Sequence, residues 1–363
     1  MAKPAAKSTQ VRHAATLADV GRAAGVSVMA ASAVLNGAKT STRISDTTRD
    51  RILAAAAHLR YRANATARGL VVRRMNTIGV ATTLLHNELN QYFLEVFNGV
   101  IEAAAAVGQN TTVFTLPDWR DGARRISGFC DGRIDGLILV APLLEPEDGK
   151  SLPDHTPLVS VHSNNELPNV VNLESDEEAG VFAMVRHMLS LGHRRILHIA
   201  GPAHSIGALR RISGYRAAHA AAGVEPPAGY IVHGEYTSHS GFHELQAWLQ
   251  AHRGDELPQA VFGGSDAIAI GCRDALVARG YRTPTDVSVV GFDDTLLARA
   301  TRLATVRQPL RELGQRAVRL LMDRIEAKQQ DTSCTLPSNI VLATEVVLGQ
   351  SLAPPRSHGL VIS

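Results

Sequence analysis

From residue 76 onward, short apolar runs alternate with stretches of helical periodicity, and this alternation constrains the fold more than any other feature. In the first half the runs read TIGVATT, NTTVFTL, DGLILVAP and PLVSVH, with helical patterns at 93–107 and after the second run. The rhythm restarts with helices expected at 177–191, 208–222, 238–251 and 267–279, alternating with RRILHIAG, YIVHGEY, QAVFGGSD and VSVVGFDD. This pattern is typical of parallel sheets covered by helices on both faces. It predicts an α/β body of two lobes with doubly wound parallel sheets and a cleft between them.

The first 75 residues differ from the rest of the chain in charge. They carry thirteen Lys and Arg against three Asp, a net charge of +10, whereas the remaining residues carry 24 basic and 31 acidic side chains, a net charge of −7. A basic module on an acidic body is typical of polyanion binding, because each Lys or Arg at a phosphate releases condensed counterions. A solvated, disordered tail would have the same charge, so the local pattern decides between the two.

The local pattern in this basic segment predicts two short helices around a tight turn. Thr16 and Asp19 form a T-x-x-D capping box that starts the first helix, and Gly25 ends it. Ser27 is the expected N-cap of a second helix over 28–35. Two short helices about a Gly turn, with small side chains where they approach each other, are typical of a helix-turn-helix.

A third helix is expected over 46–59, with Ser45 as its N-cap. An Ala-rich three-helix bundle that binds nothing would show the same pattern, but the basic charge favours nucleic acid. We therefore expect an all-α helix-turn-helix head over 16–61, preceded by a flexible basic tail over 1–15. The side chains expected to close its core from the third helix are Ile52, Leu53, Ala56 and Leu59.

These motifs, in this order and spacing, resemble the LacI/GalR (lactose repressor/galactose repressor) family of bacterial transcriptional regulators. The match runs through TLADVGRAAGVS, AVLNG and ISDTTRDRILAAAAHLRYRANATARGL, then GHRRILHIAGP, RRISGY, AVFGGSD, DVSVVGFDD and TVRQP. The resemblance implies a hinge over 62–75 and a two-lobed, periplasmic-binding-protein-like body over 76–363 for effector binding and dimerisation. The first lobe is expected at about 76–174 plus 307–337, and the second at about 175–306 plus 338–350.

The resemblance also implies how the protein holds DNA. In the family the second helix enters the major groove, and the hinge folds on the operator and wedges a leucine into the minor groove, here Leu70. The implied DNA contacts are Thr16, Leu17, Ser27, Val28, Met29, Ser32, Ala33, Asn36, Ser45, Thr48, Tyr61, Asn64, Ala67, Arg68 and Leu70.

This chain departs from the family pattern on the helix that reads the major groove. The family usually places polar side chains there, whereas Val28, Met29 and Ala33 occupy those positions here. None of them can donate a bidentate hydrogen bond to a base edge, so sequence reading is expected from thymine-methyl contacts, Ser32 and DNA deformability. Gly21 replaces a common alanine and Ala63 a common proline, which loosen the first helix and the hinge entry.

The candidate ligand-binding residues follow the apolar runs, because ligands of open parallel sheets bind beyond the carboxyl ends of the strands. In the family, the Arg of R-x-x-G-Y/F and the Asp after the AVF run hold the effector, here Arg211 and Asp266. An Arg fork and a carboxylate can bond adjacent hydroxyls, and aromatic rings can cover a sugar face. The expected effector is a sugar or similar small polyol, and an anion is less supported, since Ser-Ile-Gly stands at 205–207. The candidates are Tyr92, Phe93, His162, Asn164, Arg211, Tyr236 and Asp266.

Each candidate also has a purely structural explanation. Asp266 could cap the following helix, Arg211 could be a surface charge, and Tyr236 could belong to the core.

No catalytic site, metal site or cofactor is expected. His239 and His243 could share a helix face, but the glutamate beside His243 is not in an H-E-x-x-H frame. Ser265 lies in GGSDA, which lacks the second glycine of G-x-S-x-G, and neither a Walker nor a G-x-G-x-x-G loop is found. The three cysteines are far apart, without C-x-x-C spacing: Cys130, Cys272 and Cys334.

Together these features predict a transcriptional repressor that binds a palindromic double-stranded DNA operator as a homodimer under the control of the effector. It is expected in the bacterial cytoplasm, associated with the nucleoid when bound to DNA, and without a membrane partner, because its longest apolar run has nine residues against the ~20 that span a bilayer. The alternative is a solute-binding or sensing protein of the same two-lobed fold, whose function would require the cleft but not the basic head.

Overall fold

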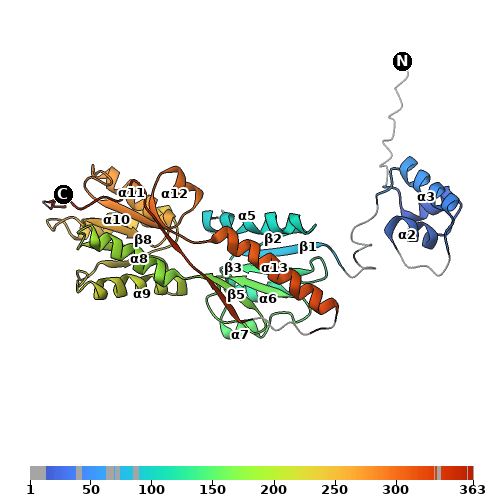
Figure 1. Ribbon diagram of the computed structural model, residues 1–363, viewed down its shortest axis with the longest axis horizontal. Coiled ribbons are helices and arrows are strands. Elements are labelled where there is room, and N and C mark those ends of the chain that lie inside the picture. The colour runs from blue at the N-terminus through green and yellow to red at the C-terminus, as the bar shows by residue number, and fades with distance from the viewer. Residues whose placement is uncertain are drawn as a thin grey trace, which may run out of the picture. The chain divides into compact units, whose positions relative to one another are not determined.

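The computed structural model of the chain describes residues 14–37, 43–62, 69, 74–84, 90–330, 332, 337–357 and 359–362. The chain divides into two compact units, Met1–Asn76 and Thr77–Ser363. In Figure 1 the described helices of the first unit are blue, and the second unit follows from cyan to red.

The first unit contains the predicted helix-turn-helix. Its helices are α1 (Leu17–Ala24), α2 (Val28–Asn36) and α3 (Asp46–His58), and the axes of α1 and α2 differ by 109°. The predicted capping box is confirmed: the Thr16 hydroxyl accepts from the Asp19 amide at 3.3 Å, and the Asp19 carboxylate accepts from the Thr16 amide at 2.9 Å. Gly25 ends α1 with φ of 63°, a backbone conformation that glycine adopts without strain.

The core of this head is small and built largely from alanine. The buried apolar side chains are Val20, Ala24, Ala31, Ile52 and Ala56. Leu59 packs against this core, but the prediction for Leu53 was wrong, because its side chain is 48% exposed. Residue 53 lies about 100° around the helix from the fully buried Ile52, on the side that faces solvent.

The first lobe of the body has a six-stranded sheet in the order β11-β5-β4-β3-β1-β2, with every pair parallel. One face packs against α5 and α13, and the other against the segment that holds α6 and α7. The central strands are buried on both faces, which explains why they read as nearly continuous apolar runs, whereas the edge strands β2 and β11 are partly exposed. The elements are β1 (Thr77–Thr83), α5 (Gln91–Ala106), β2 (Asn110–Leu116), α6 (Trp119–Phe129), β3 (Gly136–Val140), α7 (Pro146–Gly149), β4 (Leu158–Val161), β5 (Val171–Ser175), α13 (Leu310–Gln329) and β11 (Asn339–Leu342).

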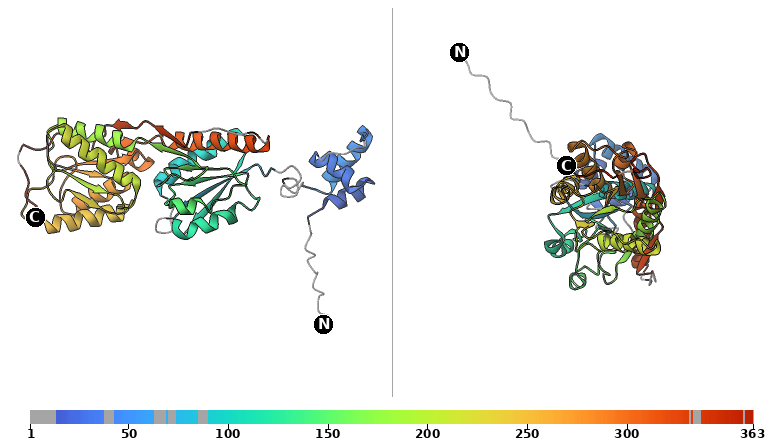
Figure 2. Two further views of the ribbon diagram at one scale, coloured as in Figure 1. Left: turned by 90° about the horizontal axis from the view of Figure 1, so that it is seen from below. Right: turned by 90° about the vertical axis from the view of Figure 1, so that its left-hand side faces the viewer.

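The second lobe repeats this plan with the order β12-β10-β9-β8-β6-β7, parallel except for the edge strand β12. One face of the sheet packs against α8 and α9, and the other against α10 and α11. Figure 2 shows the two sheets in separate lobes. The elements are α8 (Glu177–Ser190), β6 (Ile196–Ala200), α9 (Ile206–Ala221), β7 (Ile231–His233), α10 (Ser238–Ala251), β8 (Ala260–Gly263), α11 (Asp266–Ala278), β9 (Ser288–Asp293), α12 (Leu296–Ala300), β10 (Ala304–Arg307) and β12 (Glu345–Val347).

The chain passes between the lobes three times: between β5 and α8, between β10 and α13, and between β11 and β12. The first two crossings agree with the predicted lobe boundaries to within about two residues. The third does not, because β11 pairs with β5 in the first sheet, so residues 338–342 belong to the first lobe and not to the second. The short strand carries no sequence signal that shows which sheet it joins.

Within the described residues, no single helix is long and apolar enough to cross a membrane. The sharply bent pair α1 and α2 meets the same length and composition criteria only when its two members are taken together.

Candidate functional site

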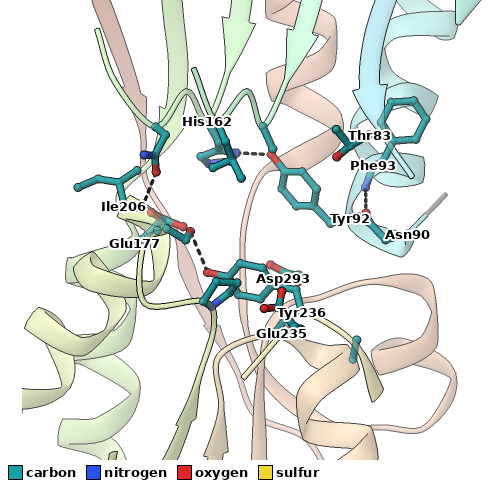
Figure 3. A pocket seen from close by; sticks show the side chains of 18 of the residues that line it. Thr83, Asn90, Tyr92, Phe93, His162, Glu177, Ile206, Glu235, Tyr236 and Asp293 are labelled. Carbon is teal, nitrogen blue, oxygen red and sulfur yellow. Dashed lines mark hydrogen bonds between the residues drawn. The ribbon is translucent and has the colours of Figure 1, made fainter. Parts of the chain in front are cut away.

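A cavity of about 230 Å3 lies between the lobes, at the carboxyl ends of both sheets. Both sheets reverse their winding next to it, at β1/β3 in the first lobe and at β6/β8 in the second. Such a switch point leaves a crevice where the loops of neighbouring strands diverge in opposite directions, which is where open α/β sheets bind ligands. Figure 3 shows the side chains that enter this space from the two lobes.

Aromatic and aliphatic side chains form much of the cavity wall. Tyr92 and Phe93 come from the first turn of α5, where the Asn90 side chain caps the helix by accepting from the Phe93 amide at 2.7 Å. Trp119, at the start of α6, lines the same cavity, and Tyr236 lines it from the second lobe. Flat apolar rings with polar edges suit a ligand that has both an apolar face and hydroxyl groups.

Arg211 lies in this wall with its charge already compensated. Its guanidinium donates to the Glu177 carboxylate at 2.6 Å and to the Gly264 carbonyl, and its Cζ lies 4.1 Å from the centre of the Phe292 ring. Burial is the largest single influence on the pKa of the Glu177 carboxyl and would raise it, but the charge and hydrogen bond of Arg211, together with His162 and Arg210, lower the pKa below its ordinary value, so the pair is ionised at neutral pH. Gly207 makes room for this carboxylate, because a Cβ there would lie 2.9 Å from Glu177 Oε1.

His162 holds Tyr92 in place across the cavity floor. Its Nδ1 lies 2.6 Å from the Tyr92 hydroxyl, and its Nε2 accepts from the Ser175 amide at 3.0 Å. Burial lowers the pKa of His162 to about 4, so the ring is neutral at neutral pH. The same Nε2 lies 2.8 Å from the Ser175 hydroxyl, so the neutral ring connects Tyr92 at one nitrogen with Ser175 at the other.

A chain of hydrogen bonds continues from His162 into the second lobe. The Ser175 hydroxyl, at the end of β5, donates to the Gln308 carboxamide oxygen, and Gln308 Nε2 donates to Asp293 Oδ1 at 2.6 Å. Ser175 and Gln308 stand at two of the three crossings between the lobes. Burial raises the pKa of the Asp293 carboxyl to about 8, with Asp266 adding to the effect against the opposing charge of Arg211. A protonated Asp293 can donate to a ligand hydroxyl.

The backbone at the cavity rim takes up unusual conformations. Ala141 after β3, His162 after β4 and Asp293 at the end of β9 have φ of 50°, 52° and 121°, and Asp294 follows with 57°. Side chains other than glycine rarely adopt these values, which cost of order 1–3 kcal/mol each. Such residues cluster at functional sites, which fits their position at the ends of three strands beside one cavity.

Polar contacts join the lobes on both sides of the cavity. Asn164 of the first lobe accepts from the Ile206 amide at 2.7 Å and so caps α9 of the second lobe. Beside it, Arg210 pairs with Glu174 at 2.7 Å. On the other side, Glu95 of α5 accepts from the Leu296 amide at 3.1 Å and pairs with Arg299 on α12. The two lobes are therefore in direct contact around the cavity.

Six of the seven predicted ligand-binding residues line the cavity, and Asp266 does not. Its carboxylate is fully buried behind the wall, where it accepts from the Thr295 amide and hydroxyl and from the Thr305 hydroxyl. Ser265, and not Asp266, caps α11. Glu177, Asp293 and Trp119 also line the cavity but were not among the predicted residues. Trp119 lies three residues after β2, Glu177 lies two residues after β5, and Asp293 is the last residue of β9, so position at the end of a strand was the available signal.

In the head, the predicted DNA contacts gather on α2 and at the helix starts. Thr16, Ser27 and Ser45 are exposed caps of the three helices, and Thr48 Oγ1 accepts from the Ser45 hydroxyl at 2.9 Å. Met29 is 71% exposed on α2, whereas Leu17 and Tyr61 pack partly against the core. The predicted hinge residues Asn64, Ala67, Arg68 and Leu70 lie outside the described residues, as does Ala63.

The possible enzyme signals have structural explanations. Ser265 is a helix cap whose hydroxyl accepts from the Ile268 amide at 3.2 Å. The His239 and His243 rings contact each other on α10, tilted by 60° with their centres 4.2 Å apart, and among the described residues no group of three or more His, Cys, Asp or Glu is placed to hold a metal. Cys130 and Cys272 are buried free thiols, and Cys334 is not among the described residues.

Comparisons with protein families agree with the two units. The family described as "Bacterial regulatory proteins, lacI family" matches residues 16–64, and the "Periplasmic binding protein-like domain" matches residues 185–352. Catabolite control protein A of Priestia megaterium is 30% identical over 334 residues, which cover 90% of this chain and 97% of the relative. The HTH-type transcriptional regulator CelR of Thermobifida fusca is 31% identical over 353 residues, with 94% and 99% covered.

Solved structures show the same similarity. The lac repressor dimer bound to operator and the anti-inducer ONPF superposes with a TM-score of 0.78 at 26% identity, covering 94% of this chain and 100% of that chain. The CelR–cellobiose complex superposes with a TM-score of 0.68 at 28% identity, covering 93% and 99%. The fold class predicted from the sequence is therefore confirmed. CelR is named as a transcriptional regulator and the lac repressor as a repressor bound to its operator, which supports the predicted regulator over a solute-binding protein or an enzyme. The chain belongs to the LacI family of bacterial transcriptional regulators.

Proposed function

We propose that this protein is a repressor that binds a palindromic DNA operator as a homodimer and changes its operator affinity when a sugar-class effector occupies the cavity between the lobes. A two-fold protein matches a palindrome, because each short recognition helix reads only a few bases. The lac repressor relative is a dimer on its operator, and the CelR relative holds cellobiose, which support the two parts of this proposal. A regulator of this kind acts in the cytoplasm, at the nucleoid.

The compensated charge of Arg211 carries the proposal about effector chemistry. A free guanidinium in a buried cavity would select an anion, but Glu177 and the Gly264 carbonyl already occupy this one. The other polar groups that line the cavity include the Tyr92 hydroxyl, the Asp293 carboxyl and the Asn164 carboxamide, and together with several aromatic faces they suit a neutral polyol. The effector contacts proposed here are Tyr92, Phe93, His162, Asn164, Arg211 and Tyr236, together with Trp119 and Asp293.

The proposed DNA contacts are those expected from the family resemblance, on α2, at the helix caps and in the hinge. The basic charge of the first 75 residues supplies affinity for phosphates that depends on salt, and Leu70 supplies the minor-groove wedge. Leu70→Ala is expected to weaken binding to the operator more than to random duplex, as measured by fluorescence anisotropy. Equal loss on both duplexes would contradict the wedge.

We propose that the effector changes operator affinity by shifting the population between two arrangements of the lobes. An effector that contacts both lobes binds better when they are closed, so it stabilises that arrangement by its difference in affinity. The change would then bias whether the two hinges of a dimer fold on DNA.

A ligand screen tests the proposal directly. Trp119 lines the cavity, so intrinsic fluorescence should change when a sugar binds, and a ligand at a hundred times its Kd should add about 2.7 kcal/mol to the stability of the body. Neutral mono- and disaccharides are expected to give the shift, and carboxylated or phosphorylated analogues are not. A positive result only with anions, or operator affinity unchanged by every ligand that binds, would refute the proposal.

A further inference from the structure

The recognition helix α2 presents an apolar surface to solvent. Ala31 is fully buried in the head, so the side of α2 opposite to it carries residues at positions 29, 33 and 36 of the helical repeat. Met29 is 71% exposed and Val28 is 47% exposed, although both side chains are large and apolar. In a head whose own core is small, two such side chains have not been used for packing.

The polar groups of the same helix lie toward its other end and contact each other. Asn36 Nδ2 lies 3.4 Å from the Ser32 hydroxyl, one turn away. The first turn of α2 therefore has no side-chain hydrogen-bond donor, since residues 28–31 are Val, Met, Ala and Ala. A helix that enters the major groove with its N-terminal residues foremost would bring this apolar surface to the bases first.

We propose that α2 reads its half-site chiefly by apolar contact with the C5-methyl groups of thymines, through Met29 and Val28. The thymine methyl is the one apolar group on a base-pair edge in the major groove, so it is the feature that these side chains can distinguish from cytosine. The inference rests on the proposed function, because it assumes that α2 lies in the groove of an operator.

Charge complementarity argues that DNA covers this surface. The first 75 residues carry a net charge of +10, which favours a polyanion over a second copy of the same basic head. A thymine-reading surface also requires no bidentate pair, so the absence of Arg, Gln or Asn at the start of α2 becomes part of the recognition.

Replacing single thymines by deoxyuridine tests the proposal, because this change removes the methyl group and leaves base pairing unchanged. The full-length chain is first used to select duplexes from a random-sequence library. Each thymine of the selected half-site is then replaced, and binding is measured by fluorescence anisotropy at fixed salt. A methyl that contacts Met29 or Val28 is expected to give about fourfold weaker binding when removed, corresponding to about 0.8 kcal/mol, and about fifteenfold when removed from both half-sites.

Variants separate this contact from general effects on the head. In Met29→Ala, the penalty for deoxyuridine at the contacted position should disappear, because the side chain that touched the methyl is gone. Leu53→Ala is the matched control: Leu53 is 48% exposed, as Val28 is, but lies on α3, and this variant should keep the full penalty. Circular dichroism of each variant shows that the head still folds.

The possible results of the deoxyuridine experiment distinguish methyl reading from operator binding itself. If deoxyuridine costs nothing at any position, or costs the same in Met29→Ala as in the unaltered chain, methyl reading is refuted while operator binding stands. If the chain selects no duplex, the proposed function is refuted and this inference with it. Concentration-dependent self-association that Met29→Ala abolishes would show that a second copy covers the surface instead.

Discussion

Replacing Glu177 by glutamine should destabilise the body and change the ligands that it accepts. Glu177 is 3% exposed and Arg211 is 8% exposed, and their charged groups are 2.6 Å apart. The glutamine can still accept one hydrogen bond from the guanidinium, but it leaves the positive charge without a counter-charge in a buried wall. Arg210 lies nearby, with Nη1 3.8 Å from Glu177 Oε2, and adds a second positive charge.

The expected loss follows from the cost of an uncompensated buried charge. Removing one partner of a buried ion pair typically costs 3–5 kcal/mol, and the hydrogen bond that remains places this case near about 3 kcal/mol. For a unit of this size, about 3 kcal/mol corresponds to a fall in Tm of roughly 6 °C. The same uncompensated guanidinium should attract anions, so a carboxylated sugar that the unaltered protein ignores should bind and restore part of the lost stability.

The assay can use the intrinsic fluorescence of the full-length chain. The protein has two tryptophans, Trp119 in the first lobe and Trp248 in the second, and both are buried in the body. Urea unfolding followed at their emission therefore reports on the body and not on the head. Trp119 also lines the cavity, so titration with a carboxylated sugar can be followed by the same signal.

Glu178→Gln supplies the control for this experiment. The change is chemically identical and lies one residue away in the same helical turn, but Glu178 is exposed and accepts from the Ser213 hydroxyl. It should shift stability by no more than about 0.5 kcal/mol. If both variants unfold within 1 kcal/mol of the unaltered protein, or if Glu177→Gln gains no affinity for anions, the assignment of Arg211 as a compensated and therefore anion-rejecting group is wrong.

Three further predictions concern the same cavity. The pKa of the Asp293 carboxyl is raised from its ordinary value near 4 to about 8, so between these two pH values the folded body keeps a proton that the unfolded chain releases. This contribution to stability is fully present below about pH 4 and is lost as the pH rises from there through 8, so Asp293→Asn should reduce the fall in Tm between pH 5 and 8. Gly201→Ala places a Cβ 2.2 Å from the Tyr236 ring and should weaken sugar binding at least tenfold in a titration, unlike Gly128→Ala, where the Cβ meets nothing within 4 Å. Asn164→Ala removes the cap of α9 and should cost about 1 kcal/mol in urea unfolding, and an unchanged midpoint would contradict the interlobe contact.

The alternation of apolar runs and helices predicted eight of the twelve strands in the part of the chain that the structure describes, and the central ones among them read as apolar runs because they are buried on both faces. The helix at 238–251 was predicted to the residue, since Thr237 caps its start and the apolar pattern stops at Ala251. Strand β11 could not be assigned in the same way. Its pattern of exposure differs from the central strands because it lies at an edge, and four residues with alternating exposure fit either sheet.

Most of the cavity residues could be predicted because they follow strands, but this position alone does not show which of their side chains face the cavity. Asp266 and Asp293 both follow apolar runs, yet the carboxylate of Asp266 turns back to Thr295 and Thr305, while that of Asp293 lies at the cavity. The difference depends on which way each side chain leaves the strand end, and this is set by tertiary contacts. The ion pair between Arg211 and Glu177 could not be predicted from the sequence either, because Glu177 is 34 residues away on another helix.

The overlap between the cavity and the interlobe crossings limits how ligand preference can change. Tyr92, His162 and Asp293 belong to the hydrogen-bonded chain that runs through Ser175 and Gln308, so a substitution at any of them alters the cavity and the crossings together. Other wall residues have no part in that chain, including Trp119, Leu143, Glu235 and Leu297. Substitutions there can reshape the space for a sugar while the polar contacts between the lobes stay intact. Substitutions of the wall residues outside the hydrogen-bonded chain can therefore change the effector and preserve the response to it. Substitutions of Tyr92, His162 or Asp293 cannot, because ligand binding and the contact between the lobes depend on the same hydrogen bonds there.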